Sequence, residues 1–387
     1  MPPLRIGYYL CFPTALGGIE KQVLTLIDYL REKHSATVFC DSGQPGGFFR
    51  AELNARGVEA QIIDLPVKDE IRGVIRPLLN NLPAIVHARR ILAASRLDVI
   101  HFHAGRLGFA YAPIVASRMV GIRTRILTLH NVVMRRSRPQ RFIEERVLRA
   151  LDQIIAVSAE LKEELVSKKC VAEEKVRVIQ NGIDFPQWDP AMEKNAARTA
   201  LAIPAGSLVV GMVGRLDRVK GVDLLIRAVA LVRAKVPNLM VVLIGAGPEE
   251  DALKRLAADQ RVSDRVWFAG YRTDARRLMH AFDLVAMPSR ADAQSFSLLE
   301  AMAGGKPVIG SNVGGIPSVL LDGTTGLLFP AEDYAALGEA LVKLLNDPKK
   351  REEMGRAGRR RVESHFSQAA MLEQTVALYG NFERAPF

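Results

Sequence analysis

Cysteine is scarce in this chain. Only Cys11, Cys40 and Cys170 occur among 387 residues, an odd number at wide spacing and without histidines at the spacing of metal ligands. Such a set indicates neither a disulfide framework nor a zinc site. The sequence therefore favours a reducing compartment, and we expect a cytoplasmic protein.

Long apolar runs are missing as well. The chain has no stretch of about 18 uninterrupted apolar residues, the length typical of a membrane-spanning helix. The apolar run at 6–16 is shorter and is expected to be a buried strand that leads into the loop 13–18, not a targeting segment. We expect a protein that is soluble or peripheral on the inner face of the membrane.

Aromatic residues are few, at 6%, and no nucleic-acid recognition module is present. Nucleic acid is therefore not an expected partner, although the formal net charge is +11. The positive charge is concentrated, because residues 101–150 hold ten arginines and two acidic residues. Two interpretations stay open for this basic window: a solvated surface, or a site for an anionic membrane or acceptor.

The remaining composition, 49% hydrophobic and 25% charged, is ordinary for a globular protein, and the length suffices for about two to three domains. Short apolar runs alternate with helical patterns, which is typical of an α/β fold with parallel, doubly wound sheets. The expected strands lie at 4–10, 36–40, 60–65, 99–102, 126–129, 154–157, 176–179, 208–213, 239–244, 266–269, 284–287 and 308–309.

The segment 181–190 is rich in turn formers and follows a strand, so it is the expected domain boundary. We predict a first domain at 1–184, a second at 185–366 and a final helix within 367–387.

The segment 286–315 carries the strongest chemical signal. Asp292 lies in a loop and Glu300 on a predicted helix at 294–303, which the glycine pair at 304–305 ends. A helix start offers unpaired N–H groups and suits an anionic group such as a diphosphate. Two acids beside it suggest a nucleotide sugar. The alternative is that Asp292 caps the helix and Glu300 lies on a solvated face.

Further candidates follow other strands. Arg215 and Lys220 share the loop after the strand 208–213, where open α/β sheets bind ligands, and together they are suited to hold a diphosphate. His103 and His130 end successive strands. His101 is expected to point to the opposite face and to be structural. Solvated loop residues and structural histidines are the alternatives.

In their order along the chain, these motifs resemble those of the retaining family-4 glycosyltransferases with the GT-B fold. The matching segments are VRVIQNGID at 176–184, VGRLDRVKGVDLLIRA at 213–228, VVLIGAGP at 241–248, VWFAGY at 266–271, the spaced PS, D and EAMA residues of 288–303, and PVIGSNVGGIPSVLLDGTTGLLF at 307–329. The resemblance covers nearly the whole chain. It implies two Rossmann-like domains facing across a cleft, with the C-terminal helix crossing back onto the first domain.

The implied activity is transfer of a hexose or N-acetylhexosamine from a nucleotide diphosphate sugar to an acceptor hydroxyl, with retention at the anomeric carbon. UDP is the expected nucleotide on the family's base rate. The acceptor would be a saccharide or a lipid-linked saccharide, as in the synthesis of cell-surface polysaccharide or glycolipid. The chain lacks any Asp-x-Asp sequence, so we expect no metal ion, and no cofactor besides the donor co-substrate.

The resemblance also implies roles for single residues. Arg215, Lys220 and the helix start near Ser295 would stabilise the leaving diphosphate. Asp292 would orient hydroxyls of the donor sugar, and Glu300 would hold the ribose. His103 takes the position where the family keeps a histidine beside the transferred sugar. The other expected substrate contacts are Gly17 and Gly18 of a GG-x-E loop, His130, the base-binding Gly270, Tyr271 and Arg272, and Ala293, Gln294, Ser295 and Phe296.

Two departures from the family pattern are visible. The family usually has glutamate at the first acidic position, followed by Gly-Phe-Gly, where this chain has Asp292-Ala293-Gln294-Ser295. The acid is one methylene shorter, and Gln294 replaces an aromatic ring. These changes leave the donor sugar open.

The segment 71–94 resembles the amphipathic acceptor-side region of enzymes that glycosylate lipid carriers, although Pro77 and Pro83 are expected to break it.

Three rival functions differ in how well the sequence supports them. A dinucleotide oxidoreductase is disfavoured, because the glycine-rich segment 245–248 lacks a third glycine. A nucleotide-sugar epimerase of the same architecture stays open. A silent sugar-nucleotide-binding protein is disfavoured by the presence of both acids, both bases and His103.

Overall fold

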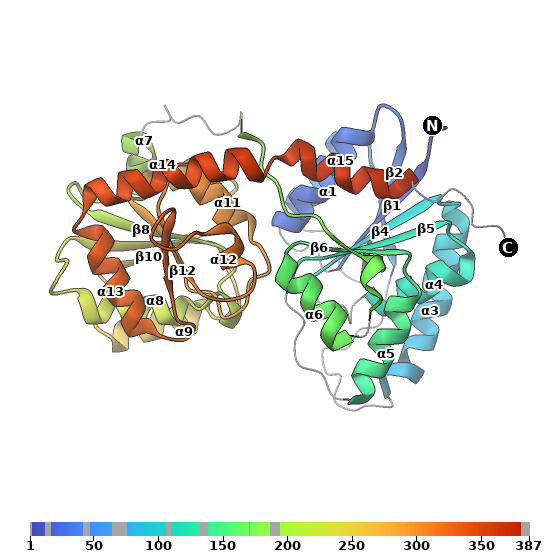
Figure 1. Cartoon of the computed structure of the whole chain (residues 1–387), viewed down its shortest axis with the longest axis horizontal. Helices are drawn as coiled ribbons and strands as arrows, with labels where there is room; N and C mark the ends of the chain where they lie inside the picture. The colour runs from blue at the N-terminus through green and yellow to red at the C-terminus, as the bar shows by residue number, and fades with distance from the viewer. Residues whose placement is uncertain are drawn as a thin grey trace. The chain divides into compact units, whose positions relative to one another are not determined.

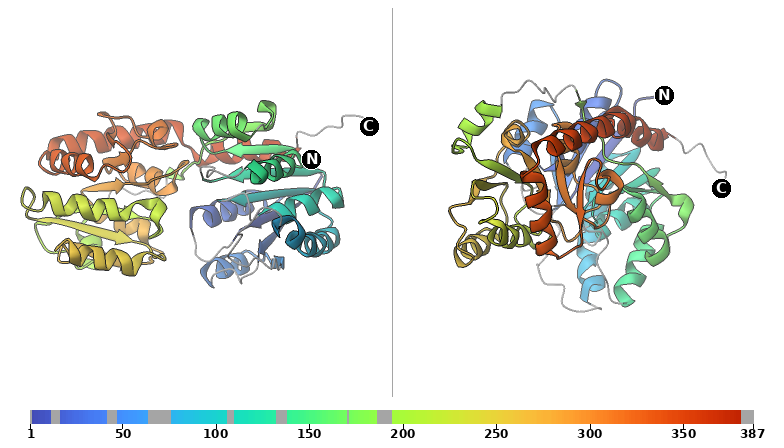
Figure 2. Two further views of the ribbon diagram at one scale, coloured as in Figure 1. Left: turned by 90° about the horizontal axis from the view of Figure 1, so that it is seen from below. Right: turned by 60° about the vertical axis from the view of Figure 1, so that its left-hand side comes forward.

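The computed structural model describes residues 2–11, 17–41, 47–63, 76–105, 110–131, 138–169, 171–185 and 194–380 (Figure 1). These residues form two compact units. Unit 1 holds the described residues up to Gln180 together with those from Leu372 onward, and unit 2 runs from Asn181 to Met371. Each unit has its own parallel sheet, with helices on both faces (Figure 2).

Unit 1 is built on a seven-stranded sheet in the order β3-β2-β1-β4-β5-β6-β7, and all its strand pairs are parallel. Its strands are β1 (Arg5–Leu10), β2 (Ser35–Asp41), β3 (Ala60–Ile63), β4 (Val99–Ala104), β5 (Thr124–Leu129), β6 (Gln153–Ala156) and β7 (Val176–Val178). Its helices are α1 (Gly18–Leu30), α2 (Gly47–Ala55), α3 (Arg76–Ser95), α4 (Tyr111–Val120), α5 (Arg138–Arg149), α6 (Ala159–Lys169) and the 3₁₀ turn η2 (Glu173–Lys175).

Unit 2 repeats this plan with six parallel strands in the order β10-β9-β8-β11-β12-β13. The strands are β8 (Leu208–Val213), β9 (Leu239–Ile244), β10 (Val266–Gly270), β11 (Leu284–Met287), β12 (Val308–Ser311) and β13 (Gly326–Phe329). The helical elements are α7 (Lys194–Ala200), η4 (Arg218–Lys220), α8 (Val222–Val232), α9 (Glu250–Asp259), α10 (Ala275–Leu278), η5 (Met279–Ala281), α11 (Phe296–Ala303), α12 (Ile316–Val319), α13 (Tyr334–Leu345) and α14 (Pro348–His365).

Both faces of the sheet in unit 2 are buried. Neighbouring strand residues such as Val209 and Val210 are both fully buried, yet they belong to different core clusters, because successive side chains point to opposite faces. This explains why the strands appear in the sequence as continuous apolar runs.

In each unit the strand order reverses at one place, and that place positions the candidate sites. The reversal falls between β1 and β4 in unit 1 and between β8 and β11 in unit 2. At such a switch point the loops at the carboxyl ends of the two strands diverge and leave room for a ligand. His103 lies near the carboxyl end of β4, and the loops with Arg215 and Asp292 follow β8 and β11.

Helix α15 (Gln368–Gly380) ends the described chain, and the division between the units falls within it, after Met371. Its first residues lie beside the segment that opens unit 2, where Ile183 and Ser367 form a parallel bridge. Its last turn belongs to unit 1, where the hydroxyl of Tyr379 lies 2.7 Å from Nδ1 of His101. The residue pattern predicted this final helix. Its place in unit 1 was implied only by the family resemblance.

One sequence prediction about an element was wrong, and one strand was not predicted. Helix α3 continues through Pro83, which was expected to break it. A helix interior tolerates proline when packing outweighs the one lost backbone hydrogen bond. Strand β13 was not predicted, because its four residues begin with a glycine and are too short to show a periodic pattern.

Candidate functional site

Three loops at the carboxyl edge of unit 2 are tied together by their backbones. Leu216 N–H donates to the carbonyl of Ala246 over 3.0 Å, and Gly245 N–H donates to that of Gly270 over 2.8 Å. A Cβ at Gly245 would lie 1.9 Å from the carbonyl oxygen of Gly214, so this close approach requires glycine. Arg215 follows Gly214 on this frame, and 69% of its side chain is exposed.

The same loop also packs against the loop that follows β11. Gly221 has a φ of +65°, and a Cβ there would lie 1.9 Å from the carbonyl oxygen of Pro288. Arg290 N–H donates to the carbonyl of Val219 over 2.7 Å. Asp217 fixes the turn by accepting a hydrogen bond from Lys220 N–H, and its carboxylate also pairs with Arg215.

Lys220 and Asp292, 72 positions apart in the sequence, form an ion pair in the structure. The distance from Nζ of Lys220 to Oδ2 of Asp292 is 2.7 Å, and the Asp292 side chain is only 3% exposed. The Asp292 carbonyl also accepts from Gly315 N–H over 2.8 Å. A buried carboxylate in this position fixes the ammonium group of Lys220 at one point, and the lysine side chain remains 22% exposed.

Helix α11 begins beside this pair, as predicted, although its first helical residue is Phe296. Ser295 caps the helix, because its Oγ accepts a hydrogen bond from Leu298 N–H over 3.3 Å. Glu300 lies one turn further along, 12% exposed, with Oε1 at 3.7 Å from Nη2 of Arg276. The helix thus presents its positive end near Lys220 and a carboxylate on its side.

Ala293 and Gln294, both predicted to contact substrate, are buried at 1% and 2% exposure. Gln294 binds Asn181 twice: its Oε1 accepts from Asn181 N–H over 2.6 Å, and its carbonyl accepts from Asn181 Nδ2 over 2.7 Å. Gln294 therefore ties the acidic loop to the residue at which the chain enters unit 2. This partnership spans 113 positions and leaves no signal in the sequence.

The predicted base-binding segment lies at the end of β10. Gly270 has a φ of +68°, which favours glycine. Tyr271 is 37% exposed. Arg272 binds Asp274 through two hydrogen bonds of 2.8 Å, so its guanidinium is already paired with a carboxylate.

In unit 1 the candidate histidines form one cluster. Nδ1 of His103 lies 3.2 Å from Nε2 of His130. The His101 ring lies on the same face as His103, with ring centroids 4.1 Å apart, which corrects the predicted opposite face. Residues two apart on a strand share a face. His101 is held by the hydroxyl groups of Thr128 and Tyr379, each at 2.7 Å.

Burial keeps these imidazoles neutral. It lowers the pKa of His101 and that of His130 to about 3, and it lowers the pKa of His103 well below the ordinary value, with His101 adding to the effect. His103 Nε2 is buried and has no hydrogen-bond partner among the described residues. A neutral imidazole offers this nitrogen as a donor or an acceptor, depending on the tautomer. It is therefore suited to a hydroxyl group, not to a phosphate.

Gly17 and Gly18 open helix α1, with Gly17 as the N-cap. The Gly17 N–H donates to Oε2 of Glu20 over 3.0 Å. This amide, predicted to contact substrate, is thus occupied by the glutamate of the GG-x-E loop, whose capping function the sequence analysis missed. A glutamate at the third helical position is the signal that would have found it.

Part of the basic window at 101–150, including Arg135 and Arg136, lies outside the described residues. In the parts of the chain that the structure describes, no group of three or more His, Cys, Asp or Glu side chains is placed to hold a metal ion. Across the same parts, no helix combines the length and apolar character needed to cross a bilayer.

Two doubly wound parallel units are the architecture expected of the GT-B fold, and the second carries basic side chains and a helix start at its switch point. Residues 16–186 match the family model described as Glycosyltransferase Family 4, and residues 193–361 match that of Glycosyl transferases group 1. The chain belongs to the family-4 GT-B glycosyltransferases, as its motifs predicted.

Curated relatives are moderately similar. The D-inositol 3-phosphate glycosyltransferase of Salinispora tropica is 29% identical over 320 residues, which cover 76% of this chain and 66% of the relative. Alpha-maltose-1-phosphate synthase of Mycolicibacterium smegmatis is 28% identical over 396 residues, which cover 95% and 96%. The match spans less than two thirds of the Salinispora protein, and 49% of a D-inositol 3-phosphate glycosyltransferase from Nocardia farcinica.

Among solved structures, Anabaena Alr3699/HepE in complex with UDP and glucose superimposes with a TM-score of 0.82 at 22% identity, over 98% of this chain and 100% of that chain. This similarity shows a common fold.

Proposed function

We propose that this glycosyltransferase transfers a hexose or N-acetylhexosamine from a UDP-sugar to an acceptor hydroxyl, with retention at the anomeric carbon. The observation that carries the proposal is the Lys220–Asp292 ion pair, with its carboxylate buried, next to the start of α11 at the switch point of unit 2. This arrangement offers positive charge to a diphosphate and a carboxylate to sugar hydroxyls. The UDP bound to Alr3699/HepE, a protein of the same fold, supports the choice of nucleotide.

The proposed roles are those that the family resemblance implies. Arg215, which is largely exposed, and Lys220 neutralise charge that develops on the leaving diphosphate. Glu300 accepts hydrogen bonds from the ribose hydroxyls. His103 offers Nε2 to a hydroxyl of the transferred sugar as a neutral group. Gly270, Tyr271 and Arg272 contact the base chiefly through the backbone, because the Arg272 side chain is paired with Asp274.

Metal independence is part of the proposal. It rests on the absence of an Asp-x-Asp sequence and on the presence of two basic side chains where a metal ion would otherwise neutralise phosphate charge. Activity is expected to survive EDTA. Complete loss on chelation that manganese or magnesium restores would contradict it.

A thermal-shift panel with UDP, GDP, ADP and their sugars tests the donor proposal, because a ligand of the folded state raises apparent stability. UDP and a UDP-sugar are expected to raise the Tm, and GDP and ADP much less. No shift with any nucleotide would contradict the proposed function.

Incubating the enzyme with the UDP-sugar alone and analysing the products separates this function from epimerisation, which needs no acceptor.

The acceptor is proposed to be a saccharide or a lipid-linked saccharide at an anionic membrane surface, in the synthesis of cell-surface polysaccharide or glycolipid. Supporting this, α3 and α4 of unit 1 contain no acidic residue in the sequence, and Leu82, Val86 and Met119 on them are 55%, 65% and 57% exposed. Arg89, Arg90 and Arg118 on the same two helices are also exposed. Exposed apolar and basic side chains together suit anionic lipid.

Changing Arg89 and Arg90 to glutamine is expected to weaken binding to vesicles that contain phosphatidylglycerol, in a salt-dependent way, and to leave UDP binding intact. Vesicle binding equal to that of the wild type would contradict the membrane part of the proposal.

A further inference from the structure

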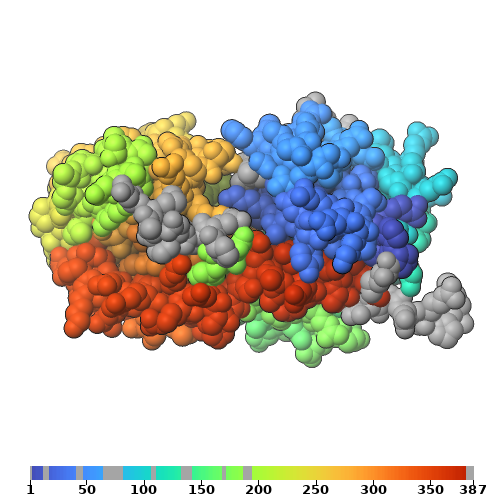
Figure 3. All heavy atoms as spheres, turned by 90° about the horizontal axis from the view of Figure 1, so that it is seen from above, coloured from blue at the N-terminus to red at the C-terminus, as the bar shows by residue number. Residues whose placement is uncertain are grey.

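Helix α14 carries five arginines, and the structure divides them into two groups. Arg356 and Arg360 are exposed. The other three are half-buried, and each donates to carbonyls at the C-terminal end of a different helix: Arg351 to α13, Arg359 to α11 and Arg361 to α12. Helix α14, which lies on the surface of unit 2 (Figure 3), thus fixes three helix ends.

Arg359 completes the C-terminal end of α11. The last four carbonyls of a helix have no partner within it. Three of those in α11 accept from backbone N–H groups of the following turn, in the pairs Gly304 to Glu300, Gly305 to Met302 and Lys306 to Ala301. The fourth, the carbonyl of Ala303, accepts from Nη1 of Arg359 over 2.8 Å. The cationic donor also complements the negative end of the helix dipole.

The two helices approach closely because α14 has glycine at the contact. A Cβ at Gly355 would lie 2.1 Å from the carbonyl oxygen of Gly305, and one at Gly358 would lie 3.5 Å from Cε of Met302. The backbone of α14 therefore lies directly against the end of α11, as Figure 1 shows. The Arg359 hydrogen bond is formed across this contact and does not depend on a mobile loop.

Helix α11 connects this contact to the candidate site. It has eight residues, so it is about 12 Å long and moves as one rigid element. Ser295 and the loop of Asp292 lie at its start, and Glu300 lies less than one turn before Ala303. A shift of the held end would therefore move both the helix start and the carboxylate of Glu300.

We propose that Arg359 is a positioning residue of the donor site. By holding the carbonyl of Ala303, it sets where the start of α11 and Glu300 meet the nucleotide diphosphate. The proposal rests on the proposed function. Arg359 lies outside the loops that carry Arg215, Lys220 and Asp292, and it would nevertheless contribute to nucleotide affinity.

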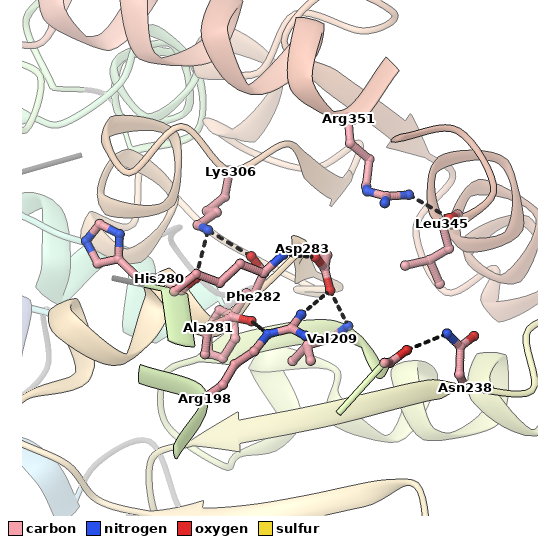
Figure 4. Close-up of polar contacts among 12 residues, drawn as sticks. Arg198, Val209, Asn238, His280, Ala281, Phe282, Asp283, Lys306, Leu345 and Arg351 are labelled. Carbon is pink, nitrogen blue, oxygen red and sulfur yellow. Dashed lines mark hydrogen bonds and ion pairs between the residues drawn. The ribbon is translucent and has the colours of Figure 1, made fainter. Parts of the chain in front are cut away.

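Arg351 on the same helix provides a matched control. Its Nη1 donates to the carbonyls of Leu344 and Leu345, at 2.6 Å each, and Figure 4 shows Arg351 beside Leu345. Arg351 thus caps α13 as Arg359 caps α11. Helix α13 carries no candidate site residue. Loss of Arg351 removes hydrogen bonds at a helix end without touching α11.

The experiment compares Arg359→Ala, Arg359→Lys and Arg351→Ala in the full chain, by calorimetric titration with UDP and by thermal unfolding without ligand. Both alanine variants are expected to lower the Tm by similar amounts. Arg359→Ala is expected to raise the Kd for UDP about tenfold, because a displaced α11 would lose roughly one charge-assisted hydrogen bond to the nucleotide. Arg351→Ala is expected to stay within twofold of the wild type, and Arg359→Lys to recover most of the affinity, because an ammonium still donates to Ala303.

The outcomes are distinct. If the two alanine variants weaken UDP binding equally, or if Arg359→Ala binds UDP like the wild type, the positioning proposal is overturned and the donor proposal stands. If the wild-type chain binds no UDP, the donor proposal fails and this one fails with it. Amide hydrogen exchange supplies a readout without nucleotide: Arg359→Ala should accelerate exchange in Phe296–Ala303 and Arg351→Ala in Tyr334–Leu345.

Discussion

The two units share a strand order at their switch points but hold opposite chemistry there. In unit 1 the carboxyl ends of β4 and β5 carry imidazoles, those of His101 and His103 fully buried, whose pKa values lie far below the ordinary value, so they are neutral. In unit 2 the matching edge carries the Lys220–Asp292 ion pair and the largely exposed Arg215. The fold alone predicts where each unit binds a ligand, and the side chains decide that one edge suits hydroxyls and the other phosphates.

The largest expected effect comes from Asp292→Asn in unit 2. The amide cannot orient sugar hydroxyls as an anion does, so turnover should fall by roughly 100- to 1000-fold, the typical loss for one preorganised electrostatic group. UDP affinity should stay the same or rise, because Lys220 loses the carboxylate that it now binds.

Turnover with the UDP-sugar, set beside calorimetry with free UDP, measures both effects, and Asp292→Glu serves as the control that keeps the charge. A loss of UDP affinity of more than about tenfold would show that Asp292 supports the nucleotide and not the sugar.

The next effect tests the neutral cluster of unit 1. His101 has a native pKa of about 3, against 6.5 ordinarily, so between these values the unfolded chain binds a proton that the native chain does not. Native stability is therefore lost as the pH falls through this window, by about 1.4 kcal/mol per pH unit from this group.

His101→Gln keeps a donor and an acceptor for Thr128 and Tyr379 without the titration. Between pH 6.5 and pH 5, its free energy of unfolding should fall by about 2 kcal/mol less than that of the wild type. Urea unfolding at both pH values measures this, and equal losses would mean that His101 takes up a proton in the native chain over the same pH range as in the unfolded chain.

A smaller effect of the same sense is expected in a higher pH range, at the other edge of unit 2. Burial lowers the pKa of Lys306 to about 8, from 10.5, while Nζ donates to the carbonyls of His280 and Phe282 (Figure 4). Between these pKa values the unfolded chain binds the extra proton, so the native chain gains stability as the pH rises.

Lys306→Met lacks this gain. Between pH 8 and pH 9.5, the unfolding free energy of the wild type should rise by about 1 to 2 kcal/mol relative to that of the variant. If the unfolding free energies of the two proteins change with pH in parallel, the lowered pKa of Lys306 is contradicted.

Much of the fold was predictable from the sequence, because buried parallel strands leave continuous apolar runs. The family and the α/β class are confirmed. The errors have local causes: the short β13 begins with glycine, and α3 continues through Pro83, which is exposed. The twofold periodicity of a strand places His101 and His103 on the same face. The prediction that His101 points to the opposite face applied this periodicity wrongly.

The candidate site was predictable only in part. Its members Arg215, Lys220, Asp292 and Glu300 belong to motifs along the chain, and their roles stay predictions. The partners that hold them are long-range pairs with no local pattern, such as Gln294 with Asn181 and Arg359 with Ala303. A sequence shows which residues are chemically able, whereas packing decides which carbonyl or amide each one meets.

The measurement that tests the contrast between the units most directly is calorimetric titration of free UDP into the wild type, Arg215→Ala and His103→Gln. Charged hydrogen bonds to phosphate contribute roughly 1.5 to 3 kcal/mol each, so Arg215→Ala should weaken UDP binding by about ten- to a hundredfold. His103→Gln should bind UDP as the wild type does, because a neutral side chain of unit 1 is assigned to the sugar. Undiminished UDP binding by Arg215→Ala, or an equal loss in His103→Gln, would contradict the assignment of the nucleotide diphosphate to the charged edge of unit 2.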